Sequence, residues 1–199
     1  RGTYNWYLKR LKTRDELWLI HEYKIYFFKG DILLVSLNLI DNIDAFIFDF
    51  DGVLTNNLVY VDADGHEFVS CSRSDGLAFD VLRKLKKPSF IISTESNSVV
   101  KARAKKLKIP VFQGVKNKVN ILNNLVNSHG YSFDKIAYIG NDLNDFQVMK
   151  LCGLRICPSD SHNEIKKIAN VVLKTKGGHG VVREILEENF KLNFLKILY

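Results

Sequence analysis

From about residue 43 onward, short apolar runs alternate with longer segments in which apolar residues recur at helical spacing. A short apolar run is typical of a buried strand, and helical spacing is typical of a helix that packs on one face. We expect strands at residues 43–49, 89–93, 111–112, 135–140, 154–157 and 171–173. We expect helices at residues 76–87, 98–107, 118–129, 142–152 and 161–169. Repeated strand–helix units predict an α/β fold, with a parallel sheet covered by helices on both faces.

One segment interrupts this alternation directly after the first predicted strand. Residues 58–61 and 67–70 have the composition of two short strands, and Asp64-Gly65 between them is a hairpin turn signal. Asp62, Asp64 and Gly65 also resemble the start of a calcium-binding loop, but the remaining ligand positions of such a loop are missing. We therefore expect a β-hairpin here.

Residues 1–40 have a different character and carry both tryptophans, four of the eight tyrosines and two of the 13 phenylalanines. Residues 23–28 and 32–37 could form a second hairpin around Lys29-Gly30-Asp31. We divide the chain into an N-terminal extension, 1–40, and a main domain, 41–199. The extension could be an oligomer contact, the remnant of a preceding domain or an artificial addition.

The composition is that of a soluble globular chain of one main domain, with 199 residues, 46% hydrophobic and 26% charged. The net charge of +7 comes from basic residues spread over predicted helix faces, without an arginine-rich run interleaved with aromatics. We therefore expect anionic small-molecule substrates and no nucleic-acid partner.

The longest apolar stretch, residues 32–40, is too short to span a membrane, so no membrane partner is expected. The three cysteines Cys71, Cys152 and Cys157 lack a Cys-x-x-Cys spacing, which favours reduced thiols and a cytoplasmic protein.

Two carboxylates, Asp49 and Asp51, stand where the first predicted strand gives way to a loop. A turn beginning at Asp51-Gly52 can bring both to the carboxyl end of the strand, where open α/β sheets place their ligands. Clustered carboxylates favour a bound cation, and one of them can serve as nucleophile while the other moves a proton. Asp-Gly is also a signal of inert turns, so this run alone leaves both alternatives open.

Four further segments follow in order. They are Ser93 within residues 91–97, Lys118 within 113–118, residues 140–145 and residues 177–184. Together with residues 49–55, these segments resemble the motifs of the haloacid dehalogenase superfamily. Within it they are similar to the small-capped sugar-acid phosphatases, including the domain found behind many CMP-sialic acid synthetases. The resemblance implies a three-layer Rossmann-like α/β fold with a short β-hairpin cap.

The resemblance also implies a reaction. Asp49 would attack phosphorus and form an aspartyl phosphate, and Asp51 would protonate the leaving oxygen and then activate water. Ser93 and Lys118 would hold phosphoryl oxygens by hydrogen bond and charge.

A Mg²⁺ cofactor is implied at Asp49, the main-chain carbonyl of Asp51, and Asn141. Many relatives have an aspartate at the position of Asn141. An amide oxygen still binds Mg²⁺ but carries no charge, so Asp142 could supply the missing carboxylate. Asp145 would act from behind the metal ligands.

Matching positions suggest that the substrate is bound by Arg73, Asp75, Glu95, Lys106 and Arg183. Octulosonate phosphatases usually carry arginine where this chain has Glu95. Glu95 together with Lys106 therefore favours the nonulosonate branch of the subfamily.

The first functional hypothesis is a Mg²⁺-dependent phosphatase of a nonulosonate (sialic acid or KDN type) 9-phosphate. The alternatives are a 3-deoxy-octulosonate 8-phosphate phosphatase of lipopolysaccharide biosynthesis, or a non-catalytic oligomerisation domain associated with a CMP-sialic acid synthetase. A signalling receiver domain is excluded, because its phosphorylated aspartate lies mid-chain and has no following cap hairpin.

The resemblance implies a homotetramer, since relatives with so small a cap close their sites with a neighbouring subunit. Leu58, Tyr60 and Phe68 would then lie at an interface. The alternative is that the hairpin and the apolar tail, residues 190–199, fold back on their own core.

Overall fold

The computed structural model describes residues 23–28, 31–36 and 39–199 of the chain. It divides between Asn42 and Ile43 into two compact units. In the first unit, β1 (Tyr23–Phe28) pairs antiparallel with β2 (Asp31–Ser36), and a 3-10 turn, η1 (Leu39–Asn42), follows. The predicted hairpin is therefore present, although Lys29, Gly30 and Leu37 lie outside the described residues.

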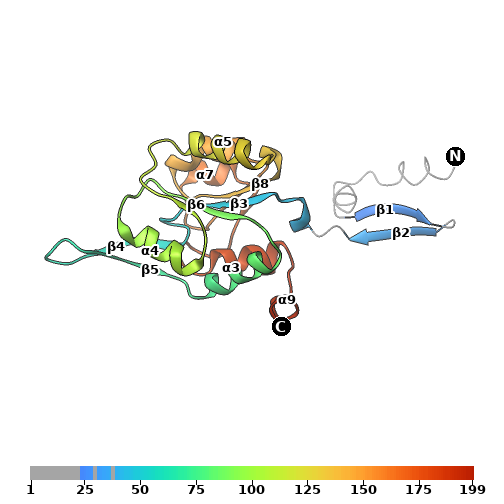
Figure 1. The fold of residues 1–199 in the computed structure, drawn as a ribbon, viewed down its shortest axis with the longest axis horizontal. Coiled ribbons are helices and arrows are strands. Elements are labelled where there is room, and N and C mark those ends of the chain that lie inside the picture. Colours follow the sequence, from blue (N-terminus) through green and yellow to red (C-terminus); the bar gives the residue numbers. More distant parts are fainter. Residues whose placement is uncertain (1–22, 29–30, 37–38) are drawn as a thin grey trace. The chain divides into compact units, whose positions relative to one another are not determined.

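The second unit is built on a six-stranded parallel sheet with the strand order β10-β9-β8-β3-β6-β7 (Figure 1). The strands are β3 (Ala45–Phe48), β6 (Ser89–Ile92), β7 (Val111–Phe112), β8 (Ile136–Ile139), β9 (Leu154–Cys157) and β10 (Val171–Val172). Every residue of β3, β6 and β8 is buried, so these strands read as continuous apolar runs, as strands covered on both faces do.

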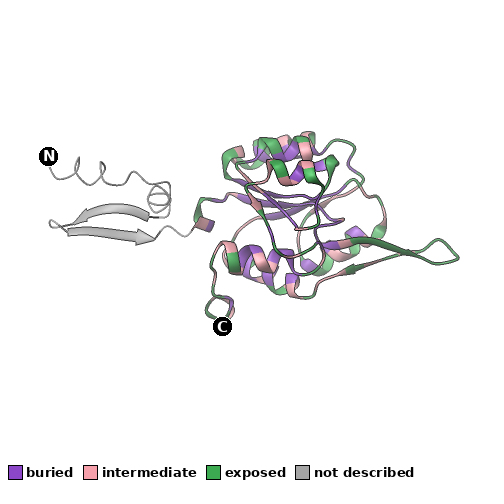
Figure 2. Ribbon diagram, turned by 180° about the vertical axis from the view of Figure 1, so that it is seen from behind, coloured by how far each residue is buried: buried purple, intermediate pink, exposed green. Residues whose placement is uncertain are grey.

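Helices cover both faces of this sheet (Figure 1). One face carries α5 (Lys118–His129), α6 (Phe146–Leu151) and α7 (Asn163–Ile168), and the other carries α3 (Ser74–Lys84) and α4 (Ser98–Leu107). The result is the three-layer α/β architecture of the haloacid dehalogenase type that the sequence predicts. Figure 2 shows the buried central strands between the two half-exposed helix layers.

Local capping explains why the predicted bounds of two helices, α4 and α5, match the structure. The Asn97 side chain accepts the Val99 N–H at the start of α4, and the Asn117 side chain accepts the Asn120 N–H at the start of α5. Gly130, at φ +70°, ends α5 in the left-handed conformation that glycine adopts without strain.

The predicted helix at 142–152 is shorter than expected. It begins as a 3-10 turn, η3 (Leu143–Asp145), because the Asp142 carboxylate accepts the Leu143 N–H before α6 starts.

The C-terminal helices were not expected: α8 (Val181–Glu184), the π-helical η4 (Ile185–Asn189) and α9 (Phe194–Leu198). Both α8 and α9 pack against α3, so the apolar tail folds back on its own domain.

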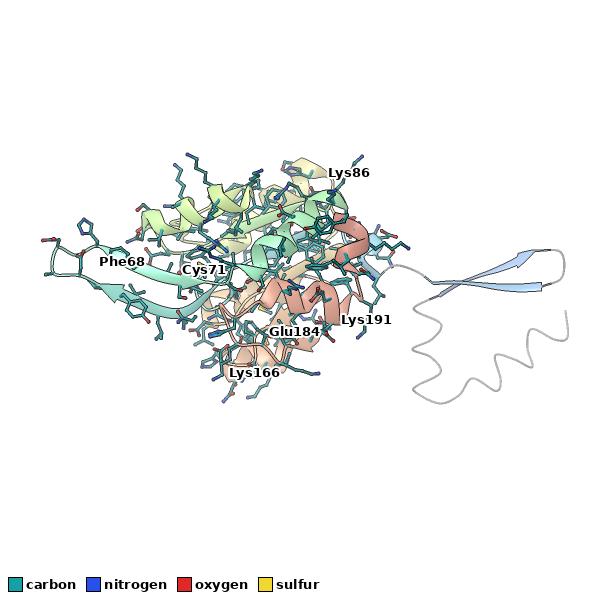
Figure 3. All side chains as sticks on the ribbon, turned by 90° about the horizontal axis from the view of Figure 1, so that it is seen from below. Phe68, Cys71, Lys86, Lys166, Glu184 and Lys191 are labelled. Atoms are coloured by element: carbon teal, nitrogen blue, oxygen red, sulfur yellow. The ribbon has the colours of Figure 1, made fainter. Side chains whose placement is uncertain are left out.

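The cap hairpin is formed by β4 (Thr55–Val61) and β5 (Glu67–Cys71), with a register shift between Thr55 and Val59. It extends away from the sheet as an arm, with Phe68 far out on it and Cys71 at its base (Figure 3). Its large apolar side chains are exposed: Leu58, Val59, Tyr60, Val61 and Phe68.

Across the described residues, no helix is long and apolar enough to cross a membrane.

Candidate active site

The predicted motifs meet at the carboxyl edge of the sheet. Asp49 directly follows β3, Ser93 follows β6, and residues 140–145 follow β8. A cavity of about 310 Å³ opens at this edge. It is lined by Asp49, Asp51, Asn57, Thr94, Asn141, Asp142, Leu143 and Asn144. Four of the predicted site residues are therefore brought together around one space.

The floor of the site is a buried charge cluster centred on Lys118. The Lys118 Nζ lies 2.8 Å from Asp49 Oδ1 and 2.7 Å from Asp145 Oδ1. All three side chains are almost completely excluded from water. Burial lowers the pKa of Lys118, but the charges of Asp49 and Asp145 together outweigh it and leave that pKa raised. Lys118 is therefore a permanent cation in contact with the predicted nucleophile.

Asp49 has a second hydrogen bond that fixes its orientation, because the Phe50 N–H donates to its Oδ1 at 2.7 Å. Burial raises the pKa of Asp49 well above its usual range, and the nearby Asp145 charge adds to the effect, while Lys118 opposes it. A divalent cation against this carboxylate would favour its ionised form.

Asp145 holds the motif around Asn141 in place. Its Oδ1 accepts a hydrogen bond from the Tyr138 hydroxyl at 2.9 Å as well as from Lys118, and its Oδ2 accepts the Asn141 N–H at 2.9 Å. A side chain at Gly140 would place its Cβ 2.7 Å from the Asp145 carboxylate, so the glycine leaves room for this contact. Asp145 thus lies behind the cavity, as the resemblance implies.

The loop after Asp49 wraps tightly around the side chain of Asn141. Gly52 has φ +73°, and a Cβ there would lie 1.9 Å from Asn141 Nδ2. Thr55 Oγ1 accepts the Gly52 N–H at 3.2 Å and donates to Asp51 Oδ1 at 3.4 Å. Burial raises the pKa of Asp51, and the charge of Glu95 raises it further. A raised pKa suits a group that must donate a proton near neutral pH.

The C-terminal signature braces the same loop from outside. The Gly178 N–H donates to the Val53 carbonyl at 3.0 Å, and a Cβ at Gly177 would lie 2.2 Å from the Gly52 carbonyl oxygen. Two consecutive glycines are needed because backbone packs directly on backbone here.

The donor set fits a hard divalent cation. Asn141 Oδ1 is buried and has no hydrogen-bond partner among the described residues, although a buried amide oxygen ordinarily has one. It lines the same cavity as the carboxylates of Asp49, Asp51 and Asp142. Oxygen donors of this kind are those that Mg²⁺ prefers.

Ser93 is buried beside this edge, and its Oγ accepts the Glu95 N–H at 3.1 Å. Its hydroxyl group donates to no acceptor among the described residues. Ser93 and Lys118 are not among the residues that line the cavity, but Ser93 adjoins Thr94 in sequence and Lys118 contacts Asp49.

The structure does not bring the five predicted substrate-binding residues to the cavity wall. The Glu95 carboxylate accepts the N–H groups of Ser96 and Asn97 in the loop just before α4. Lys106 is exposed on α4, and Arg73 is exposed at the start of α3.

The other two of these residues have partners elsewhere. The Arg183 guanidinium pairs with Glu187 through two hydrogen bonds of 2.8 Å. Asp75 is buried and accepts the N–H groups of Val182 and Arg183 at 2.9 Å and 3.2 Å, joining α3 to α8.

Four residues of the cavity wall were not predicted: Asn57, Thr94, Leu143 and Asn144. Thr94 directly follows Ser93, and Leu143 and Asn144 lie within the motif at 140–145, so proximity to a motif was an available signal. Asn57 had no such signal, because its position depends on the register shift in the hairpin.

Comparisons with known proteins agree with this geometry. Residues 92–185 match the family model of haloacid dehalogenase-like hydrolases. The chain is 30% identical to the 3-deoxy-D-manno-octulosonate 8-phosphate phosphatase of Escherichia coli K12 over 148 residues, 74% of this chain and 79% of that protein.

Solved structures give the same result. A haloacid dehalogenase family protein of Streptomyces avermitilis is 41% identical with a TM-score of 0.72, covering 74% of this chain and 84% of that one. The octulosonate phosphatase of Moraxella catarrhalis, solved with magnesium, phosphate and KDO, is 28% identical with a TM-score of 0.72, covering 80% and 89%.

The buried charge cluster allows us to predict the effect of removing the positive charge of Lys118. Lys118→Met leaves Asp49 and Asp145 buried without a counter-charge, which should lower the free energy of unfolding by about 3–5 kcal/mol at neutral pH. Lys116→Met, at an exposed position two residues earlier, should change it by less than about 0.5 kcal/mol. Urea unfolding of the three proteins measures both values, and equal stability of the two variants would contradict the assigned ion pairs.

Asp75 predicts a pH dependence of stability. Burial raises its pKa to about 6, against the lowering effect of the Arg183 and Val182 N–H groups. In the unfolded chain the pKa is about 4, so the folded state binds the proton more tightly. This group therefore makes the free energy of unfolding fall as the pH rises from about 4 to about 6, by about 3 kcal/mol in total.

Asp75→Asn keeps an acceptor for the same N–H groups but cannot ionise. The variant should lose this part of the pH dependence and gain stability relative to the wild type above about pH 6. Urea unfolding at several pH values measures the slopes, and parallel curves for the two proteins would show that Asp75 does not titrate in this way.

Proposed function

The chain belongs to the haloacid dehalogenase-like hydrolases, and on that premise we propose that it hydrolyses the phosphomonoester of an acidic sugar. The first candidate substrate is 3-deoxy-octulosonate 8-phosphate. It is a phosphatase, and its cofactor is Mg²⁺. The observation that carries the proposal is the buried contact between Lys118 and Asp49 beside a cavity lined by further carboxylates.

In the proposed reaction Asp49 attacks the phosphorus atom through an oxygen that lies at the floor of the cavity. Asp51 gives its proton to the departing sugar oxygen, which its raised pKa makes possible, and then takes a proton from the attacking water. The phosphoryl group passes from the sugar to Asp49 and then to water. Lys118 and the Ser93 hydroxyl stabilise the negative charge of the transferring group.

Asp49, the main-chain carbonyl of Asp51, Asn141 and Asp142 would hold Mg²⁺. When bound, the cation offsets the repulsion between the anionic nucleophile and the anionic ester. The unpartnered Asn141 oxygen is the strongest support for this part of the proposal. The intact charge cluster favours catalysis over a purely structural role beside a CMP-sialic acid synthetase.

The preferred substrate candidate differs from the one expected from the sequence, which was a nonulosonate 9-phosphate. The Glu95 carboxylate, on which that preference depended, is engaged with backbone N–H groups in the loop just before α4. The curated relative named above is an octulosonate phosphatase. Nine-carbon sugar acids remain the second candidate, because Glu95 stands where octulosonate phosphatases usually carry arginine.

We also propose that the chain acts as a cytoplasmic homotetramer built on the cap hairpin. Leu58, Tyr60 and Phe68 are each more than half exposed, and such an apolar surface favours burial against another subunit. Light scattering at micromolar concentration should give a tetramer, and Phe68→Glu should dissociate it. A fully active wild-type monomer would contradict this assembly.

A panel of sugar-acid phosphates tests the function directly. With Mg²⁺, release of inorganic phosphate should be fastest with 3-deoxy-octulosonate 8-phosphate, and Asp49→Asn should lower kcat by at least about 10³-fold while the variant still folds. A wild-type protein that hydrolyses no sugar-acid phosphate, or an Asp49→Asn variant with wild-type turnover, would refute the proposal.

Metal affinity tests the ligand set separately. Asn141→Asp adds a charged oxygen at the buried, unpartnered position, so Mg²⁺ should bind it about tenfold more tightly than the wild type. Asn144→Asp, which adds the same charge at the cavity rim, is the matched control and should change affinity less. Calorimetric titration without substrate measures all three. Tighter binding by the wild type than by Asn141→Asp would rule out Asn141 as a ligand.

A further inference from the structure

The cap hairpin contributes one side chain to the cavity wall, that of Asn57. Asn57 lies on β4 within the register shift between Thr55 and Val59, so it is outside the regular pairing with β5. Its backbone has φ +62°, a left-handed conformation that residues other than glycine rarely adopt. Such a conformation often marks a functional position.

Local hydrogen bonds hold this conformation. The Asn57 N–H donates to Thr55 Oγ1 at 3.2 Å, and the same oxygen accepts the Gly52 N–H. Asn57 is therefore tied to the loop that carries Asp51. The neighbouring Asn56 uses its side chain to accept the Leu58 N–H, whereas the Asn57 amide has no hydrogen-bond partner among the described residues.

Other uncharged polar groups line the same cavity. The Asn144 amide donates to Thr94 Oγ1 at 3.4 Å, and among the described residues the Thr94 hydroxyl hydrogen and the Asn144 side-chain carbonyl oxygen have no hydrogen-bond partner. Thr94 follows β6 and Asn144 lies in η3, so these groups come from parts of the domain far from the hairpin in sequence. The exposed side chain of Leu143 supplies an apolar surface beside them.

We infer that Asn57, Thr94 and Asn144 form a recognition rim for the hydroxyl groups of the leaving sugar, with Asn57 as a specificity-determining residue. This inference deepens the proposed function and rests on it. Amide and hydroxyl groups both donate and accept, as sugar hydroxyls do, whereas the carboxylates of the cavity, Asp49, Asp51 and Asp142, are assigned above to the metal and the phosphoryl transfer. A substrate without hydroxyls would leave the rim unused.

The rim predicts a selective effect on substrate recognition. Asn57→Gly removes the amide, and glycine adopts φ +62° without strain, so the loop should keep its shape. We expect kcat/KM for the sugar-acid phosphate to fall about tenfold, mainly through KM, as expected for one or two lost hydrogen bonds. With p-nitrophenyl phosphate, which has no hydroxyl groups, kcat/KM should stay within about twofold of the wild type.

Two further variants complete the test. Lys108→Gly replaces another left-handed residue, with φ +58°, at the end of α4 and should change neither substrate's kinetics. Thr94→Val should show the same selectivity as Asn57→Gly. Inhibition by inorganic phosphate should be equal in all four proteins, since the rim does not contact the phosphoryl group.

The outcomes separate this inference from the proposed function. Equal loss on both substrates in Asn57→Gly, or no loss on either, would overturn the rim. If the wild type hydrolyses a different sugar phosphate and no sugar-acid phosphate, the proposed substrate fails. The rim is then tested by comparing kcat/KM for the sugar phosphate that is hydrolysed with kcat/KM for p-nitrophenyl phosphate, in the wild type and in Asn57→Gly.

Discussion

The site depends on one buried cation held between two buried carboxylates. Lys118 is the first residue of α5, Asp49 directly follows β3, and Asp145 stands in the turn after β8. Charges excluded from water are tolerated only when they are paired and hydrogen-bonded, so the contacts of Lys118 tie these three elements together. The same contacts place Asn141, because its N–H is bound by Asp145 and its side chain is enclosed by the Gly52 loop.

Loops from distant parts of the sequence add to this centre. The loop after β9 contributes the His162 N–H, which donates to the Asn141 carbonyl at 2.9 Å. The two glycines at 177 and 178 close over the Gly52 loop by backbone packing. The catalytic geometry is therefore supported by the whole carboxyl edge of the sheet, while the hairpin arm adds a single side chain at the rim.

The sheet, its helices and the motif residues could be predicted from the sequence because their determinants are local. Apolar runs, the caps at Asn97 and Asn117, and the end of α5 at Gly130 all act within a few residues. The five motifs carried the family resemblance, and the comparisons confirm it.

The substrate-facing residues could not be predicted in the same way, because a polar side chain has several possible partners and the sequence does not show which one it binds. Glu95 accepts N–H groups of the loop before α4 and Arg183 pairs with Glu187, and neither partner is marked by a motif. Asn57 lines the cavity from within the register shift of the hairpin, and that register is set by pairing with a strand ten or more residues away. Asp75 was predicted to bind the substrate, whereas its role in joining α3 to α8 depends on C-terminal helices that the sequence did not predict.

The central claim is that Asp49 is the group that receives the phosphoryl group, and an intermediate trapped on it tests this most directly. In Asp51→Asn, p-nitrophenyl phosphate can still phosphorylate the enzyme because its leaving group needs no proton, but water is no longer activated. After acid quenching, mass spectrometry of the digested protein should find one phosphoryl group, on Asp49, matched by a burst of one p-nitrophenol per site. A phosphoryl group on another residue, or a burst that leaves Asp49 unmodified, would contradict the account.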